Sequence, residues 1–142
     1  MQKVFIDTSA LYAILDIKDA NHKKAGVTYK ILLSSGTKFT LTDHILSESL
    51  TLIRRRLGYK KSLEFAAIIQ QGEAVELFNI VFVDRPAFRL ANQFFEQRKS
   101  VKISYVDCLS FATMNIQKIS DCFAYDNHFR EAGFNNIEDS LS

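Results

Sequence analysis

Short apolar runs alternate with longer amphipathic stretches along this chain. Five runs predict strands, at residues 3–6, 38–41, 80–83, 122–125 and 134–137. The stretches between them carry apolar residues at helical spacing, with polar caps before them and Gly or Pro at their ends. They predict helices at about 8–15, 22–33, 43–57 and 61–71, one entered at Pro86, one running from Ser104 to about Ile116, and a brief one at 127–132.

Strands that alternate with helices favour right-handed crossovers and a parallel sheet. We therefore expect an α/β fold, a three-layer α/β/α sandwich with a mainly parallel sheet of about five strands, formed by one domain over residues 1–142. In such folds the reactive groups gather at the carboxyl ends of the strands. Asp7 and Asp126 each follow directly on a predicted strand, so this rule selects both.

Composition narrows the class of protein without identifying it. The chain has 142 residues, is 47% apolar and carries a net charge of +2, which permits nucleic-acid binding but does not require it. No signal peptide or membrane-spanning run is apparent, which favours the cytoplasm. Cys108 and Cys122 lack zinc-ligand spacing and are expected to be buried, reduced thiols.

Each acidic residue of interest also has a purely structural explanation. Asp7 and Asp126 are placed to cap the helices that follow them, and Ser104 with Asp107 has the spacing of a capping box. Glu48 is different, because it lies in mid-helix near Ile45 and Leu52, where we expect it to be partly desolvated. A desolvated carboxylate needs a partner, which is either an arginine or a divalent cation.

Convergence of these acids at one sheet edge would have a chemical consequence. Neighbouring carboxylates repel one another, and their pKa values rise unless a counter-charge is present. Mg²⁺ or Mn²⁺ suits an all-oxygen ligand set and supplies that charge. Such an ion can activate water and neutralise charge that develops on a phosphodiester. A site of this kind is therefore compatible with metal-dependent phosphodiester hydrolysis.

Four motifs in order resemble those of the PIN-domain ribonucleases, and especially the VapC-type toxins of toxin–antitoxin pairs. The first is the run from Val4 to Ser9 with Asp7, and the second is Thr42 followed by Glu48. The third is the run from Ile103 to Cys108 with Asp107, and the fourth is Tyr125 to Phe129 with Asp126. The resemblance covers nearly the whole chain and implies a PIN-like fold.

The resemblance also implies residue roles and partners. The protein would be a Mg²⁺- or Mn²⁺-dependent endoribonuclease, with Asp7 and Asp107 as direct ligands and Glu48 and Asp126 holding water or a second ion. Thr8 or Ser9 would orient the first acid through a hydroxyl. The partners would be an RNA substrate, a small antitoxin protein and a second copy of the chain. The family often has Ser or Thr two residues before the fourth acid, where this chain has Ala124.

Several alternatives remain at this point. The basic residues Arg54, Arg55, Arg56 and Lys60 either contact RNA phosphates or the antitoxin, or form a solvated helix end. His128 could reach a phosphate, although an exposed helical histidine is the simpler expectation. Ala124 leaves room for a catalytically weak scaffold that binds RNA or protein. A phosphotransfer receiver domain is disfavoured, because Thr8 stands where such a module needs a second acid.

Overall fold

One five-stranded sheet organises the structure, a computed structural model that describes residues 2–100 and 102–141. All the strand pairings are parallel, and the strand order is β3-β2-β1-β4-β5. The strands are β1 (Lys3–Ile6), β2 (Lys38–Thr42), β3 (Phe78–Val81), β4 (Asp121–Phe123) and β5 (Asn135–Asn136). The predicted three-layer α/β architecture with a five-stranded parallel sheet is confirmed.

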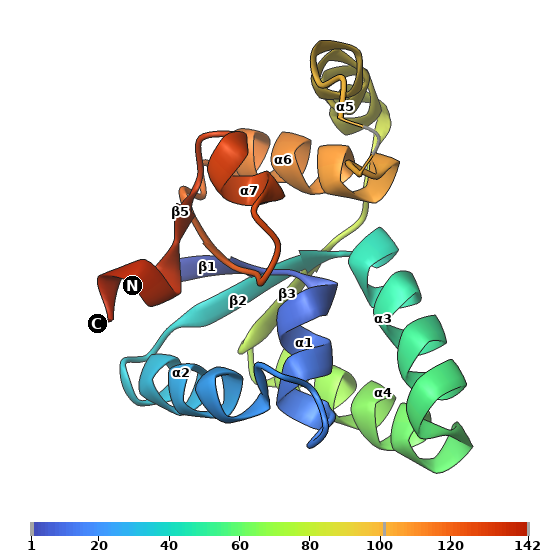
Figure 1. Ribbon diagram of the computed structural model, residues 1–142, viewed down its shortest axis with the longest axis vertical. Helices are drawn as coiled ribbons and strands as arrows, with labels where there is room; N and C mark the ends of the chain where they lie inside the picture. Colours follow the sequence, from blue (N-terminus) through green and yellow to red (C-terminus); the bar gives the residue numbers. More distant parts are fainter. Residues whose placement is uncertain (1, 101, 142) are drawn as a thin grey trace.

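Helices cover both faces of this sheet (Figure 1). On one face lie α5, α6 and α7, and on the other lie α1, α2 and α4, while α3 runs from the sheet edge down beside α1 and α4. The helices are α1 (Thr8–Leu15), α2 (His22–Ser34), α3 (Asp43–Leu57), α4 (Tyr59–Ala74), α5 (Arg85–Gln97), α6 (Tyr105–Gln117) and α7 (His128–Glu131), and a 3₁₀ turn, η1, spans Ile137–Ser140.

The central strand β1 is buried on both faces, as its continuous apolar sequence predicts. Val4, Phe5 and Ile6 are fully buried. Phe5 and Phe111 both pack against the ring of Phe129 on one side of the sheet, with ring centroids 6.1 and 5.1 Å apart. This packing fixes the end of β1 and the start of α7 relative to one another.

The chain reverses its direction across the sheet between β1 and β4. From β1 it moves outward through β2 to β3, and it then crosses over to β4 and β5 on the other side of β1. Such a switch point leaves a crevice outside the carboxyl ends of the two strands, because their connections leave on opposite faces. Asp7 follows β1, and Asp126 lies three residues after β4.

The prediction for residues 61–83 is wrong in two places. Gly72 does not end the fourth helix but lies buried inside α4, where a Cβ would collide with the ring of Phe78. The strand expected at 80–83 is β3, displaced two residues toward the N-terminus, since Phe78 pairs with Phe39 in β2. Phe82 is 72% exposed, so its apolar character does not mark a buried strand.

The C-terminal elements are shorter than predicted. The strand expected at 122–125 ends at Phe123, and the edge strand expected at 134–137 has only two residues before η1 begins. No helix within residues 2–100 or 102–141 is long and apolar enough to cross a bilayer.

Candidate functional site

Asp7 stands at the junction of β1 and α1 and is only 5% exposed. Its backbone N–H donates to the carbonyl of Phe123, which continues the β1–β4 pairing. Its Oδ2 accepts hydrogen bonds from the Ser9 N–H at 3.1 Å and the Ser9 hydroxyl at 2.7 Å. The Ser9 hydroxyl in turn accepts the N–H of Tyr125 at 2.9 Å. The predicted capping role is therefore real, and it immobilises one oxygen of this carboxylate.

Asp107 is held at the first turn of α6 by the predicted capping box. The Ser104 hydroxyl accepts the Asp107 N–H at 3.0 Å, and Asp107 Oδ2 accepts the Ser104 N–H at 3.1 Å. This reciprocal pair satisfies two helix N–H groups that would otherwise lack partners. The side chain is buried against the helix end, where these hydrogen bonds restrict its rotation.

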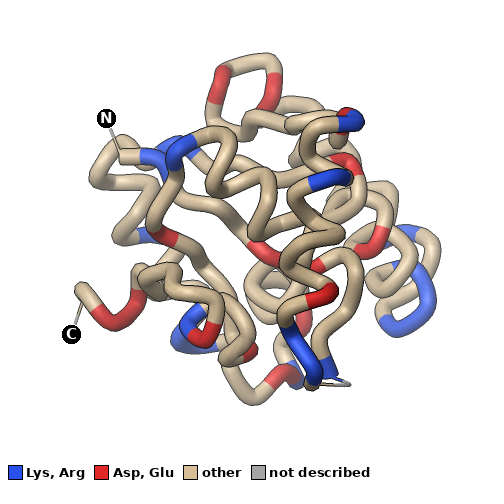
Figure 2. Tube along the Cα trace, turned by 90° about the horizontal axis from the view of Figure 1, so that it is seen from above, with Lys and Arg blue, Asp and Glu red and all other residues tan. Residues whose placement is uncertain are grey.

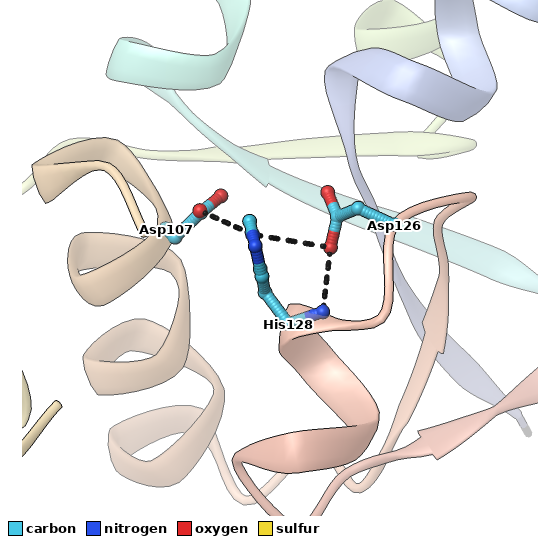
Figure 3. Close-up of side chains that lie close together, drawn as sticks. All are labelled: Asp107, Asp126 and His128. Carbon is cyan, nitrogen blue, oxygen red and sulfur yellow. Dashed lines mark hydrogen bonds and ion pairs between the residues drawn. The ribbon is translucent and has the colours of Figure 1, made fainter. Parts of the chain in front are cut away.

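Asp126 lies on the loop between β4 and α7, beside His128 (Figure 3). Its Oδ1 accepts the backbone N–H of His128 at 3.0 Å. The His128 ring meets Asp107 as well, with Nδ1 at 3.0 Å from Asp107 Oδ2 and 3.7 Å from Asp126 Oδ1. One ligand atom from each of these three residues lies within 4.8 Å of the others. Asp7 lies outside this group but on the same cleft.

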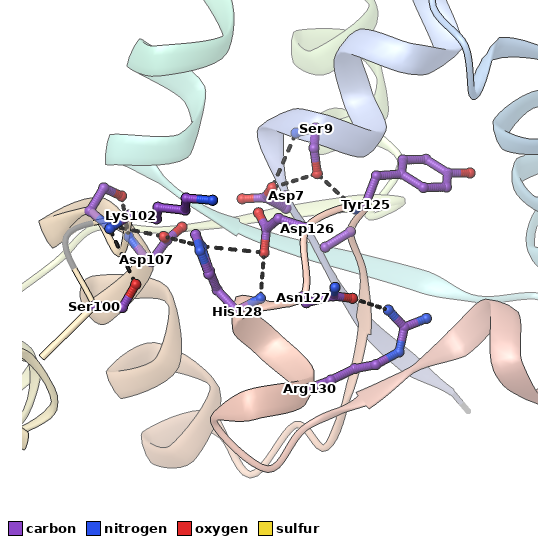
Figure 4. Close-up of polar contacts among 12 residues, drawn as sticks. Asp7, Ser9, Ser100, Lys102, Asp107, Tyr125, Asp126, Asn127, His128 and Arg130 are labelled. Carbon is purple, nitrogen blue, oxygen red and sulfur yellow. Dashed lines mark hydrogen bonds and ion pairs between the residues drawn. The ribbon is translucent and has the colours of Figure 1, made fainter. Parts of the chain in front are cut away.

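The three aspartates share one pattern of hydrogen bonding (Figure 4). Each uses one carboxylate oxygen for contacts within the protein: Oδ2 of Asp7, Oδ2 of Asp107 and Oδ1 of Asp126. The second oxygen of each accepts no hydrogen bond from the described residues. The surrounding residues thus hold each carboxylate through one oxygen and leave the other oxygen for a ligand.

The electrostatics of the cluster call for a positive charge. Burial, followed by the negative charge of Asp126, raises the pKa of Asp7 to about 7 despite the two hydrogen bonds from Ser9. Burial and the charge of Asp107 also raise the pKa of Asp126. A divalent cation would offset both the desolvation and the repulsion. Carboxylate oxygens are the donors that Mg²⁺ and Mn²⁺ prefer, so these residues fit such an ion.

These residues line a cleft of about 670 Å³ at the carboxyl edge of the sheet. Glu48 reaches the same cleft from α3, together with Thr8, whose hydroxyl accepts that of the buried Ser49 at 3.0 Å. The expectation that Glu48 is partly desolvated is wrong, because its side chain is exposed. The face that it shares with Leu52 opens into the cleft instead of the core.

Cations border the carboxylates on two sides. Arg55 and Arg56 line the cleft from the end of α3, and the Arg56 guanidinium lies 5.4 Å from the ring centroid of Tyr12. Lys102 comes from the loop before α6, and its side chain points toward Asp7 and Asp107 (Figure 4). Figure 2 shows the basic residues in separate groups around the molecule, not on one continuous face.

Two of the predicted basic residues do not reach the cleft. Arg54 and Lys60 are exposed, and neither is among its lining residues. Arg54 instead lies over the ring of Tyr59, at 4.8 Å from the centroid. Successive residues of an α-helix lie about 100° apart around its axis, so a run of three arginines cannot all point the same way.

Sequence reasoning missed His128 as part of the cluster. The prediction that His128 is an exposed helical histidine is wrong, because its side chain is only 18% exposed and lies between two aspartates. Its position two residues after an acid that follows a strand is a weak local signal. The contact with Asp107 joins residues 21 apart and depends on the fold.

Comparisons with known proteins identify the family and agree with the fold. The family model for the PIN domain matches residues 4–135. The 23S rRNA-specific endonuclease VapC20 of Mycobacterium tuberculosis is 31% identical over 134 residues, which cover 92% of this chain and 95% of that protein.

Solved structures give the same result. The crystal structure of M. tuberculosis VapC20, described as a Sarcin-Ricin loop cleaving toxin, has a TM-score of 0.78 and 30% identity over 92% of this chain and 95% of that one. FitAcB from Neisseria gonorrhoeae has a TM-score of 0.69 over 94% of this chain and 95% of that one. Its identity of 17% supports the shared fold alone.

Proposed function

The chain belongs to the PIN-domain family, and we propose that it is a metal-dependent endoribonuclease that hydrolyses RNA phosphodiester bonds. One observation carries the proposal. Asp7, Asp107 and Asp126 reach the same cleft from three separate elements, each with one carboxylate oxygen left for a ligand. The raised pKa of Asp7 supports a site completed by a cation.

In this proposal the three aspartates hold a divalent cation, Mg²⁺ or Mn²⁺. When bound, that ion supplies Lewis acidity, which activates water and stabilises charge on the phosphate. Ser9 keeps Asp7 in position through its two hydrogen bonds. Glu48 lies exposed in the same cleft, where it would orient the attacking water. Thr8 supports the α1–α3 wall through Ser49.

The cations beside the carboxylates support RNA as the substrate. Arg55 and Arg56 on one side and Lys102 on another are placed to contact phosphates that flank the scissile bond. Because the similar VapC20 is named for 23S rRNA, we propose a structured loop of ribosomal RNA as the substrate class. Such a substrate would place the reaction in the cytoplasm.

We further propose that the chain is the toxin of a toxin–antitoxin pair and that it forms a homodimer. A small hollow between α1, α2 and α4, lined by Leu11, Tyr29 and Phe65 among others, offers an apolar surface for an antitoxin. Phe82, Phe88 and Phe95 are exposed, the last two on α5 across the sheet from this hollow, and they offer a surface for self-association. Sedimentation of the chain with and without the small protein of the adjacent reading frame would test both points.

The nuclease proposal is tested by incubating the purified protein with ribosomal RNA in Mn²⁺, in Mg²⁺ and in EDTA. We expect cleavage with either metal and none in EDTA. Asp7→Asn should reduce the rate at least a hundredfold, because it removes a ligand charge and keeps the helix cap. Glu64→Gln is the matched control, since it removes one charge from an exposed position on α4. Full activity of Asp7→Asn, or cleavage in EDTA, would refute the proposal.

The same experiment separates the nuclease from a PIN-like scaffold that only binds RNA or protein. Ala124 is the residue that supports this scaffold alternative, because the family often has Ser or Thr at this position. Ala124 is buried, and its backbone carbonyl accepts a hydrogen bond from the Asn136 side chain. The Ser9 hydroxyl, however, bonds Asp7 directly and occupies this region of the site. RNA binding without any metal-dependent cleavage would favour the scaffold. The receiver-domain alternative is wrong, because the chain belongs to the PIN-domain family.

A further inference from the structure

His128 occupies a central place among the acidic residues. It is the first residue of α7, and its ring lies between the N-terminus of α6 and the loop that carries Asp126 (Figure 3). Nδ1 lies 3.0 Å from Asp107 Oδ2 and 3.7 Å from Asp126 Oδ1. Its backbone N–H also donates to Asp126 Oδ1. One residue therefore contacts two carboxylates that come from different elements.

The direction of the contact with Asp107 follows from the chemistry of its atoms. An ionised carboxylate oxygen only accepts hydrogen bonds, so Nδ1 must carry the hydrogen and donate it. The oxygen that it contacts on Asp107 already accepts the Ser104 N–H. On Asp126 the nearest oxygen is the one that accepts the backbone N–H. His128 thus engages only the oxygens that face the scaffold, and it leaves Asp107 Oδ1 and Asp126 Oδ2 to the cleft.

The two acids differ in how firmly the fold holds them. Asp107 belongs to a helix of 13 residues and to a complete capping box. Asp126 lies on a loop before a helix of only four residues, and the repulsion between the two carboxylates opposes their approach. A donor between like charges offsets that repulsion. The imidazole of His128 is placed to be this donor.

We propose that His128 is a positioning residue: its Nδ1–H holds Asp107 and its backbone N–H holds Asp126, so that one free oxygen of each faces the same divalent cation. The inference rests on the proposed function, because it assigns a role within the metal site of that nuclease. Residues that orient metal ligands in this way commonly alter metal affinity by about 10–100-fold when they are lost.

The fold should tolerate loss of the imidazole. The adjacent Phe129 is fully buried and packs against Phe5 and Phe111, so α7 stays attached to the core without help from position 128. A change in metal affinity can then be separated from unfolding by measuring the thermal midpoint of each variant in EDTA.

Three substitutions test the geometry of the donor. Asn places an amide N–H where Nδ1 stands, Gln places it one atom farther out, and Leu removes it. We expect His128→Asn to bind Mn²⁺ within about threefold of the wild type, and His128→Gln and His128→Leu to bind it about 10–100-fold more weakly by calorimetry. His44→Leu is the control, because His44 also contacts an aspartate but lies outside the cleft lining.

Pulsed electron paramagnetic resonance of the Mn²⁺-loaded protein provides a second readout. A positioning role predicts no strong coupling to a directly bound nitrogen in the wild type. The proposal is overturned if His128→Leu binds Mn²⁺ as tightly as the wild type does. It is also overturned if a strong nitrogen coupling is present in the wild type and absent in His128→Asn, because His128 would then be a ligand itself. Wild-type protein that neither binds Mn²⁺ nor cleaves RNA would refute the proposed nuclease as well.

Discussion

Replacing Asp7 with Asn should stabilise the metal-free protein at pH 8, although the same substitution should lower the rate of metal-dependent cleavage at least about a hundredfold. The carboxylate is buried beside Asp126, and its pKa is raised from 3.8 to about 7. At about 1.4 kcal/mol per pKa unit, this corresponds to ~4 kcal/mol of stability that ionisation of Asp7 removes from the fold. Asn keeps an oxygen for the two Ser9 donors and is as good a helix cap as Asp, so the variant retains the contacts and loses the charge.

The sign of the pH dependence follows from proton uptake. The unfolded chain releases the Asp7 proton near pH 4, whereas the folded chain holds it until about pH 7. Between these values the folded state binds more protons, so the free energy of unfolding falls as pH rises, and it stays low above pH 7. Asp7→Asn lacks this loss. The stability difference between variant and wild type should therefore be near zero at pH 4 and largest above pH 7.

The measurement is thermal unfolding at pH 4, 6 and 8 in EDTA. A gain of about 2–4 kcal/mol would raise the melting temperature by roughly 6–14 °C for a chain of this length. Added Mn²⁺ should then raise the melting temperature of the wild type much more than that of Asp7→Asn, because binding stabilises only the fold that holds the ion. The exposed substitution Glu64→Gln should show neither effect. A variant that is less stable than the wild type at pH 8, or a difference that does not change with pH, would refute this account.

Two further predictions concern packing and RNA contacts. Gly72→Ala should cost about 1–3 kcal/mol in denaturant unfolding, because its Cβ would overlap the ring of Phe78, whereas Gly26→Ala, with open space around it, should be neutral or slightly stabilising. Arg55→Gln should weaken RNA binding and reduce the slope of log affinity against log salt by about 0.7–0.9, while Arg54→Gln, outside the cleft lining, should leave that slope unchanged. An unchanged slope for Arg55→Gln would contradict a phosphate contact.

Local signals allowed the elements around the site to be predicted accurately from sequence. The bounds of β1, α1 and α3 agree with the expectation, because Asp7 and Thr42 are side-chain caps and Gly58 ends α3 with a positive φ of 96°. Each of these signals acts within about four residues. The three acids were selected by the same means, since each follows a strand or opens a helix.

The errors arise where distant contacts decide the outcome. Gly72 has the sequence signature of a helix end, but it lies inside α4, where the absence of a Cβ leaves room for the ring of Phe78. The register of β3 is set by its pairing with β2, which the apolar Phe82 does not reveal. Lys102 and His128 reach the cleft from segments that only the folded sheet brings together. No local pattern distinguishes them from other surface cations and histidines.

The acidic residues also explain why capping and metal binding were difficult to separate from sequence. The sequence presents the two roles as alternatives, yet in the structure Asp7 caps α1 and Asp107 completes the capping box of α6 with one oxygen, and each presents its other oxygen to the cleft. Capping is thus the means by which the fold aims the free oxygen, because it fixes the carboxylate plane. A substitution that keeps the cap but removes the charge should therefore move stability and activity in opposite directions. One that removes the cap, such as Ser104→Ala beside Asp107, should lower both.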